Sequence, residues 1–394
     1  MKKFLFTNML KSVTQMFNTT FLGIYFLKIS GGNISEVALF YIIWYLFHPI
    51  FMYMISKKLN KDNIISMYRT GILLDLICFM ILFLAKSNIV KFIYPFAILM
   101  AFREAVYWIP QMMLVYNVNQ ENTYKKYFSY THIIEKVWII ISTLATGYLI
   151  TENSYDFVFM IIIALGAIVY ITTFSLDKVT YEQKSIEIKK MKEILKNKDA
   201  KRTYEIFLFY GMNSGGVLLV LIQLIIFMQF NSEFSIGYLN AIFAVIATIT
   251  TILVNKHIKV KYYQKAFIIA GLLIVSSIIP MIINTNFTFF VIYNIALNIG
   301  GQVLSILLAT NRFQVNENEQ FKDYRLENIM LGEIYLAIGR VTGFILLFIV
   351  GNIAFNILSV KILIMISSLL IIVEMIIYNK LERYKNVKQT IEKM

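Results

Sequence analysis

Charged side chains occur inside long apolar segments of this chain, where hydrocarbon would surround an unpaired charge. Such a charge costs at least about 2.5–3.5 kcal/mol at the centre of a bilayer, so each of these residues must face protein or water. Buried carboxylates can take up and release protons, and buried arginine or lysine can hold an anionic group. The residues concerned are Lys11, Asp75, Arg103, Glu104, Glu135, Lys136, Glu333, Arg340 and Glu374.

Two adjacent pairs of opposite charge, Arg103–Glu104 and Glu135–Lys136, stand out in this group. Adjacent residues point about 100° apart on a helix, so each pair must divide between two faces. The long side chains of Arg103 and Glu135 could form a bridge between two neighbouring helices. Alternatively, the opposite charges neutralise one another in a purely structural role, and Lys136 fits that role best.

A stripe of polar residues marks the first apolar segment. Their spacing of three and four residues places all six on one helical face. Such a stripe lines a neighbouring helix or an aqueous cavity, because lipid would leave its polar groups unsatisfied. The six residues are Asn8, Lys11, Ser12, Gln15, Asn18 and Thr19.

The second half of the chain carries polar residues of a similar kind. Tyr210 and Asn213 precede Gly215–Gly216, where a helix could bend and let its backbone approach a ligand; close helix packing explains these glycines equally well. Glu333 and Arg340 are seven residues apart, share a face and could be the counterpart of the charged pairs. A further polar stripe consists of Asn294, Asn298, Gln302 and Ser305.

Motifs of enzymes are absent from the sequence. It contains no HExxH pair, phosphate-binding loop, nucleophile elbow or dinucleotide fingerprint. The three histidines are dispersed and lack the spacing of a metal site. We therefore expect neither an enzyme nor a bound cofactor or metal, and no ATP-driven pumping by this chain alone.

Twelve long apolar runs must position the polar residues described above. A helix needs about 20 apolar residues to cross a bilayer, and this chain is 58% hydrophobic with a mean hydropathy of +0.68. The sequence therefore predicts an all-α membrane protein with 12 transmembrane helices. The predicted spans are residues 4–30, 36–56, 64–85, 92–117, 128–150, 156–176, 203–230, 235–254, 266–283, 286–310, 327–351 and 354–378.

Lysine and arginine concentrate in alternate gaps between these runs. Short loops rich in basic residues stay on the cytoplasmic side, so the pattern predicts that the N- and C-termini are both cytoplasmic. The opposite loops, such as TENSYD and GNIA, carry no basic residue. The net charge of +14 then reflects topology signals that face anionic lipid, and no nucleic-acid partner is expected.

The chain also shows a weak internal repeat. At an offset of 196 residues, Glu121–Asn122 matches Glu317–Asn318, and Thr146–Gly147 matches Thr342–Gly343. Each half has an even number of spans, so the repeat is parallel, about an axis along the membrane normal. We expect a six-helix bundle at 1–176, a cytoplasmic loop at 177–202 containing an amphipathic helix, a second six-helix bundle at 203–380, and a cytoplasmic tail at 381–394.

The span count, central loop and parallel repeat resemble the major facilitator superfamily along essentially the whole chain. The family's loop between spans 2 and 3 has its counterpart at 54–61, where Lys58 and Lys61 keep the basic character. The family's Asp is replaced by Lys57 and its second Gly by Asn60. Arg103 matches a buried arginine of many members. The resemblance implies a monomer in the cell (plasma) membrane.

We therefore expect a secondary active transporter of a small solute, working by alternating access and coupled to protons, with efflux favoured over uptake because many small bacterial members are exporters. Arg103 would supply fixed positive charge, while Asp75, Glu104, Glu135 or Glu333 would take up the proton. The alternative is a non-transporting membrane protein on the same fold, such as a sensor, immunity factor or assembly factor. The expected pathway residues are Lys11, Gln15, Asn18, Asp75, Arg103, Glu104, Glu135, Asn213, Asn298, Glu333 and Arg340.

Overall fold

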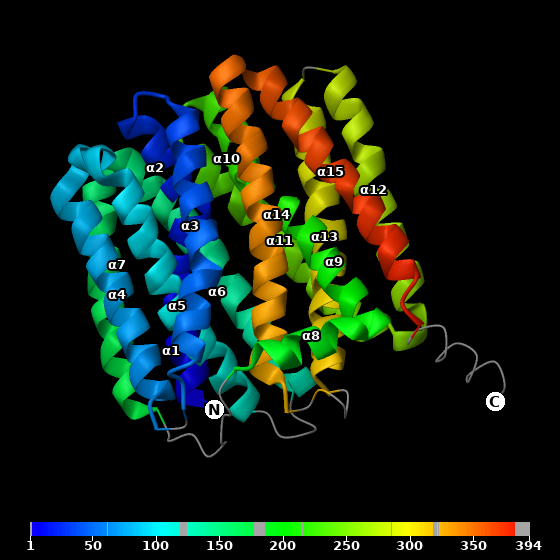
Figure 1. Cartoon of the computed structure of the whole chain (residues 1–394). Coiled ribbons are helices and arrows are strands. Elements are labelled where there is room, and N and C mark those ends of the chain that lie inside the picture. Colours follow the sequence, from blue (N-terminus) through cyan, green and yellow to red (C-terminus); the bar gives the residue numbers. More distant parts are fainter. Residues whose placement is uncertain are drawn as a thin grey trace. The chain divides into compact units, whose positions relative to one another are not determined.

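Helices are the regular elements throughout the part of the chain that the structure describes, and that part contains no strand (Figure 1). A computed structural model describes residues 2–60, 62–118, 124–176, 186–213, 216–284, 286–317, 321 and 323–382. Helices satisfy every backbone hydrogen bond within one segment, which long apolar runs require in lipid. The all-α prediction is confirmed.

The chain separates into two units. The first contains residues 1–186, 222–242 and 347–353, and the second contains residues 187–221, 243–346 and 354–394. The helices that begin before residue 187 are α1 (Lys2–Thr20), α2 (Leu22–Ile29), α3 (Ile34–Ser56), α4 (Ile64–Ala85), η1 (Lys86–Phe92), α5 (Ile93–Val118), α6 (Tyr124–Glu152), α7 (Tyr155–Thr172) and η2 (Thr173–Ser175).

The remaining helices begin after residue 187, and three of them contribute residues to both units. They are α8 (Ile188–Lys196), α9 (Lys198–Met212), α10 (Val217–Phe230), α11 (Glu233–His257), η3 (Val260–Tyr262), α12 (Tyr263–Ile283), α13 (Phe287–Glu317), α14 (Arg325–Ile353) and α15 (Ile357–Asn379).

In the first unit, α5 packs between α3 and α4, while α7 contacts α4 and α1 contacts both α6 and α7. Close approach of α4 to α5 depends on Gly71, where an added Cβ would lie 2.6 Å from the Tyr107 Cα. The side chain of Phe17 is fully buried and makes edge contacts with Phe79 and Phe159. These contacts hold α1 against α4 and α7.

The first unit also includes residues 222–242, at the end of α10 and the start of α11. Gly237 lies against α6, where an added Cβ would be 2.5 Å from the Thr143 carbonyl oxygen. Lys28 Nζ forms an ion pair with Glu233 Oε1 at 2.7 Å, and the Tyr155 hydroxyl donates to the same oxygen at 3.1 Å. A backbone contact and a shared carboxylate therefore fix this segment within the unit.

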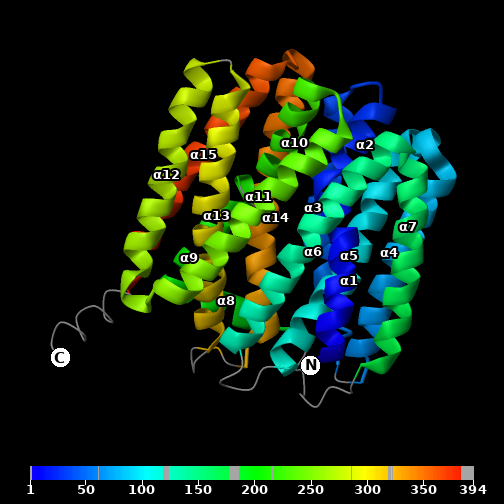
Figure 2. The same ribbon diagram turned by 180° about the vertical axis from the view of Figure 1, so that it is seen from behind.

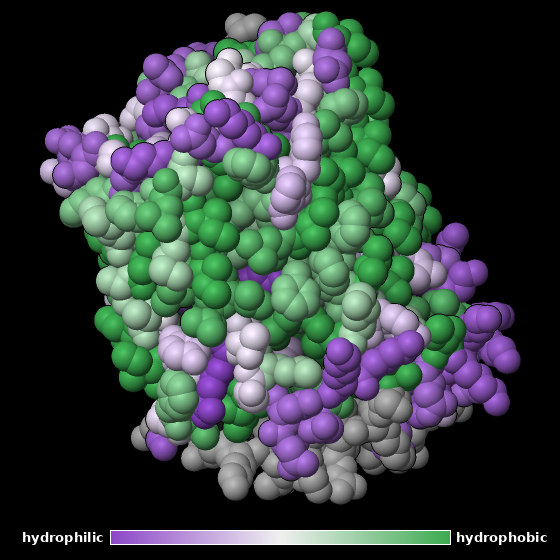
Figure 3. Space-filling view, turned by 60° about the vertical axis from the view of Figure 1, so that its left-hand side comes forward, coloured by the Kyte–Doolittle hydropathy of each residue, from purple (hydrophilic) through white to green (hydrophobic). Residues whose placement is uncertain are grey.

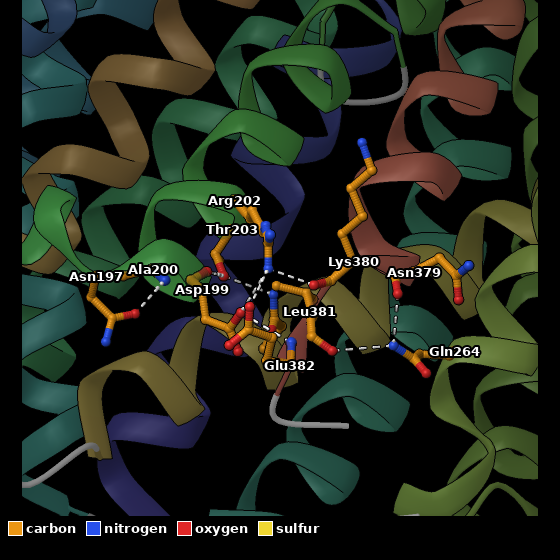
Figure 4. Close-up of polar contacts among 11 residues, drawn as sticks. Asn197, Asp199, Ala200, Arg202, Thr203, Gln264, Asn379, Lys380, Leu381 and Glu382 are labelled. Carbon is orange, nitrogen blue, oxygen red and sulfur yellow. Dashed lines mark hydrogen bonds and ion pairs between the residues drawn. The ribbon is translucent and has the colours of Figure 1, made fainter. Parts of the chain in front are cut away.

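In the second unit, α12 contacts α13 and α15, and α9 contacts α15 and α8. The Phe267 and Tyr378 rings stack with centroids 4.0 Å apart. At the end of α15, Arg202 Nη1 donates to the Lys380 carbonyl at 2.5 Å, and Gln264 Nε2 donates to the Leu381 carbonyl at 3.2 Å (Figure 4). Side chains of α9 and α12 thus satisfy carbonyls that the helix end leaves unpaired.

Two of the predicted spans each contain two helices. The span 4–30 contains α1 and α2, which meet at Phe21, although hydrogen bonds from Phe21 N to Phe17 O and from Tyr25 N to Phe21 O continue the helical pattern between them. The span 203–230 contains most of α9, which ends at Met212, and α10, which begins at Val217.

Nine segments within the described residues are long and apolar enough to cross a membrane, and one of them, residues 64–115, contains both α4 and α5. Helix α13 runs to Glu317, so it extends beyond the predicted span 286–310. On the face drawn in Figure 3, apolar side chains cover the middle and polar ones gather toward the ends. The chain is a helical membrane protein, while the count of twelve spans and the side of each terminus stay predictions.

We expect Gly71→Ala to destabilise the protein by about 1–3 kcal/mol, because the new methyl group overpacks the backbone of α5. Gly166→Ala is the matched control in the same unit, since its Cβ would lie 3.7 Å from the Leu76 side chain, an ordinary contact. Alanine favours a helix over glycine at both sites. Thermal unfolding in detergent should show a lower midpoint for Gly71→Ala alone; equal midpoints would contradict the packing described here.

Candidate functional site

Three buried charged residues meet inside the first unit. Lys11 and Asp75 are each 3% exposed, and Arg103 is 4% exposed. Lys11 Nζ lies 2.5 Å from Asp75 Oδ2, and Arg103 Nη1 lies 2.7 Å from Asp75 Oδ1. Each oxygen of one carboxylate therefore accepts from a different cation, and we call these three residues the charge cluster.

Each member of the charge cluster lies near the middle of its helix. Lys11 belongs to α1, Asp75 to α4 and Arg103 to α5. Packing of α5 on α4, with α1 nearby through α7, brings the three midpoints together. The cluster is therefore far from both helix ends, where water would otherwise solvate such charges.

Aromatic and hydroxyl groups surround the cations. The Lys11 Nζ donates to Thr14 Oγ1 at 2.6 Å and lies 5.0 Å from the centroid of the Tyr107 ring. The Arg103 guanidinium carbon lies 5.7 Å from the Trp44 ring. Ring faces attract cations, most strongly where water is excluded, so these contacts help to stabilise charges that have left water.

Glu104 extends the same network by one residue. The Trp44 Nε1 donates to Glu104 Oε2 at 2.5 Å, and the Glu104 side chain is only partly buried. Adjacent residues of α5 thus point in different directions, as the sequence predicts, with Arg103 toward Asp75 and Glu104 toward Trp44. The half-buried carboxylate is the more accessible of the two acidic groups near the cluster.

The charge cluster could bind an anionic group. Two cations share one fully buried carboxylate, and the partly buried Glu104 carboxylate of the same network interacts electrostatically with both of them. In the described part of the chain, Arg103 Nε has no hydrogen-bond partner. A guanidinium with an unused donor is well suited to hold a carboxylate or phosphate group.

The polar stripe of the first span does not behave as one surface. Asn8, Lys11 and Asn18 are buried, whereas Gln15 and Thr19 are exposed. The Asn8 Oδ1 accepts from the Tyr68 hydroxyl at 2.9 Å, and Asn18 Oδ1 has no hydrogen-bond partner within the described residues. Neighbouring helices therefore cover part of the stripe, and Gln15 is the predicted pathway residue that stays accessible.

The predicted pathway residues of the second half lie in the second unit. Asn213, at the end of α9, is fully buried, and its Nδ2 donates to Glu374 Oε1. Glu333 accepts from Arg312 Nη1 at 3.2 Å. Asn298 is half-buried and donates to the Asn294 carbonyl of its own helix at 2.9 Å. Asn213, Glu333 and Asn298 therefore each have a different hydrogen-bond partner among these contacts.

Arg340 and Glu135 complete the predicted set. Arg340 lies on α14, and its Cγ would be 3.1 Å from a Cβ added to Gly216, beside the interruption between α9 and α10. Glu135 lies in α6, but its side chain falls outside the described residues, so the expected bridge between Arg103 and Glu135 stays a prediction.

The sequence contained a signal for the charge cluster that spacing alone did not reveal. Asp75 and Arg103 each sit near the midpoint of a predicted span, and opposite charges at equal depth in neighbouring spans can pair. Lys11 lies nearer the start of its predicted span, 4–30. Pairing Asp75 with Arg103 also required knowing that α4 and α5 pack together. Within the described residues, no group of three or more His, Cys, Asp or Glu side chains is arranged to hold a metal ion.

The sequence is similar to a known family and to a bacterial protein. The pattern of the Major Facilitator Superfamily matches residues 4–320. The uncharacterized protein YqgE of Bacillus subtilis (strain 168) is 20% identical over 331 residues, which cover 83% of this chain and 76% of that protein.

Solved structures resemble the fold along nearly its whole length. A bacterial homologue of the iron transporter ferroportin in its outward-facing state has a TM-score of 0.68 at 11% identity, covering 97% of this chain and 99% of that chain. The human organic anion transporter MFSD10 (TETRAN) has a TM-score of 0.66 at 8% identity, covering 96% and 99%. At such low identities the likeness shows a shared fold alone.

We expect Asp75→Asn to destabilise the protein by about 3–5 kcal/mol, because Lys11 and Arg103 would remain buried without a counter-charge. Lys11→Met should destabilise the protein less than Asp75→Asn, since it leaves the Asp75–Arg103 pair intact. Thermal unfolding in detergent measures both.

The double variant Lys11→Met with Asp75→Asn should be more stable than Asp75→Asn alone, because only one buried cation then lacks a partner. If the stability losses of the two single variants added up to that of the double variant, the three side chains would not be energetically coupled.

Proposed function

The chain belongs to the major facilitator superfamily, and from that premise we propose that it moves a small solute across the plasma membrane by alternating access. Membership of this family and the solved relatives support a membrane transporter. In the proposal, two six-helix bundles at 1–176 and 203–380 rock about a central site, both termini are cytoplasmic, and the protein works as a monomer.

The observation that carries the proposal is the charge cluster. Lys11 and Arg103 both contact Asp75, so three charged groups are held together inside the spans. Burying them is costly, and charged groups inside membrane spans are candidates for a transport site. Arg103, with its unused Nε donor, is the residue that we propose to contact the solute.

The unused donor of Arg103 suggests the class of solute. Two similar solved structures are described as an iron transporter homologue and a metal transporter, and another as an organic anion transporter. Arginine is permanently cationic, so the position beside its Nε repels a metal cation and attracts an anion. We therefore propose a small organic anion, with a carboxylate or phosphate group that docks beside Arg103.

Proton coupling and outward transport complete the proposal. Carboxylates buried in the spans can exchange protons as water gains and loses access to them. Asp75, Glu104, Glu135 and Glu333 were the expected carriers, and they remain proposals. Efflux is favoured over uptake by analogy with small bacterial members of the family.

A second function has one specific observation in its favour. Lys57 and Asn60 stand where the family's loop between spans 2 and 3 carries Asp and Gly. A member that no longer transports, and serves as a sensor, immunity factor or assembly factor, could have lost that signature while keeping the fold.

We expect a screen of small organic anions to yield a ligand that raises the thermal unfolding midpoint of the purified protein. A ligand that binds only the native state, present at 100 times its Kd, stabilises that state by about 2.7 kcal/mol. Arg103→Gln should weaken that ligand at least about tenfold, because it removes a charge-assisted hydrogen bond.

Arg69→Gln is the matched control, since Arg69 lies on α4 of the same unit and donates to the Thr173 carbonyl at 3.2 Å. The ligand found should then be transported by proteoliposomes that contain the wild-type protein. Absence of binding and of transport for solutes of every charge, with folded protein, would favour the non-transporting function.

A further inference from the structure

A carboxyl group is buried at the interruption between α9 and α10. Helix α9 ends at Met212, Asn213 has φ −117° and ψ −104°, and α10 begins at Val217. Glu374 projects from α15 onto this point and is 0% exposed. An interrupted helix leaves backbone carbonyl and N–H groups without intrahelical partners, so the place is polar although it is buried.

The contacts of Glu374 are too few for a charged carboxylate. Its Oε1 accepts a hydrogen bond from Asn213 Nδ2. Its Oε2 has no hydrogen-bond partner within the described residues, and the ion pairs found there do not include Glu374. A neutral amide donor on one oxygen compensates little of the hydration that a charged carboxylate loses on burial.

Three other buried carboxylates provide the contrast. Asp75 contacts two cations, Glu233 contacts Lys28, and Glu333 contacts Arg312. A cation within about 4 Å favours the charged form of a carboxylate. Glu374 makes no such contact within the described residues, so it is better suited than Asp75 or Glu333 to hold a proton near neutral pH.

The groups that face Glu374 come from several elements. Helix α9 contributes Tyr210, which pairs with Ser305 of α13. Helix α14 brings Arg340 to the same interruption, beside Gly216. Helix α12 contacts α15 with apolar residues, among them Gly271 against the Met375 side chain, and its sequence has no titratable residue from 266 to 283. The other charged residue of α15, Lys361, lies more than three helical turns from Glu374.

We propose that Glu374 is a proton-binding site of the second unit, which holds its proton while buried and releases it when water reaches the carboxyl group. The acid O–H bond breaks on release, the proton passes to a water molecule, and Asn213 Nδ2 keeps its hydrogen bond to the carboxylate that forms. Proton binding by Glu374 stands on the geometry alone, whereas its use as the coupling step rests on the proposed transport function.

Infrared spectroscopy of the reconstituted full-length protein tests proton binding without any solute. A protonated carboxyl group gives a C=O stretching band distinct from that of carboxylates, and we expect such a band at neutral pH that fades as the pH rises. Glu374→Gln should remove it, while Glu333→Gln should leave it, since Glu333 pairs with Arg312. Identical spectra for wild type and Glu374→Gln would overturn the proposal.

Glutamine has the shape of the neutral acid, so Glu374→Gln should fold. Should it fail to fold, wild-type protein with isotope-labelled glutamate replaces it. An isotope shift of the band assigns the proton to a glutamate, as proposed, and the absence of a shift overturns the proposal.

Transport assays separate this inference from the function on which its coupling role rests. With a solute found by the anion screen, Glu374→Gln should still exchange solute across the membrane. Accumulation of the solute driven by a pH gradient should be at least about tenfold lower than with the wild type, which corresponds to a loss of about 1.4 kcal/mol of coupling free energy. Equal accumulation by both proteins would overturn the coupling role. An infrared band without transport of any solute would leave the proton site in place and contradict the transport function instead.

Discussion

Burial of charge in a low-dielectric interior is the constraint on which the rest of this structure depends. Asp75 accepts from Lys11 at 2.5 Å and from Arg103 at 2.7 Å, and all three residues are almost completely buried. None of the three could stay charged in hydrocarbon by itself. The fold of the first unit must therefore hold α1, α4 and α5 at one depth, because separating them would leave unpaired charges in place of a compensated cluster.

Close approach of the helix backbones allows charged side chains on neighbouring helices to meet. Gly71 allows α4 to contact α5 at Tyr107, and in the second unit Gly211 and Gly339 lie against carbonyl oxygens of the facing helix, between α9 and α14. Small residues at helix contacts let van der Waals packing replace the hydrophobic effect, which is weak between helices in lipid. Side chains as short as aspartate can then reach partners on neighbouring helices.

Buried acids in this structure have two kinds of partner. Asp75 of the first unit and Glu333 of the second contact cations. Glu374 of the second unit accepts a hydrogen bond from the Asn213 amide beside the end of α9, and the ion pairs found within the described residues do not include it. The first arrangement underlies the proposed solute contact at Arg103, and the second underlies the proposed proton site.

The sequence by itself determined the all-helical class, the family resemblance, and the types of residue that carry chemistry. Those properties follow from local composition and periodicity: apolar runs long enough for a bilayer, and charges inside them that lipid would reject. It also marked Gly215–Gly216 as a place where a helix could bend or pack closely, because glycine weakens a helix and has no side chain. Tertiary structure decided which charges meet. Asp75 pairs with Arg103 and Lys11, Glu333 with Arg312, and Glu374 with Asn213, since each partner lies on another helix and only packing sets the distance between their side chains.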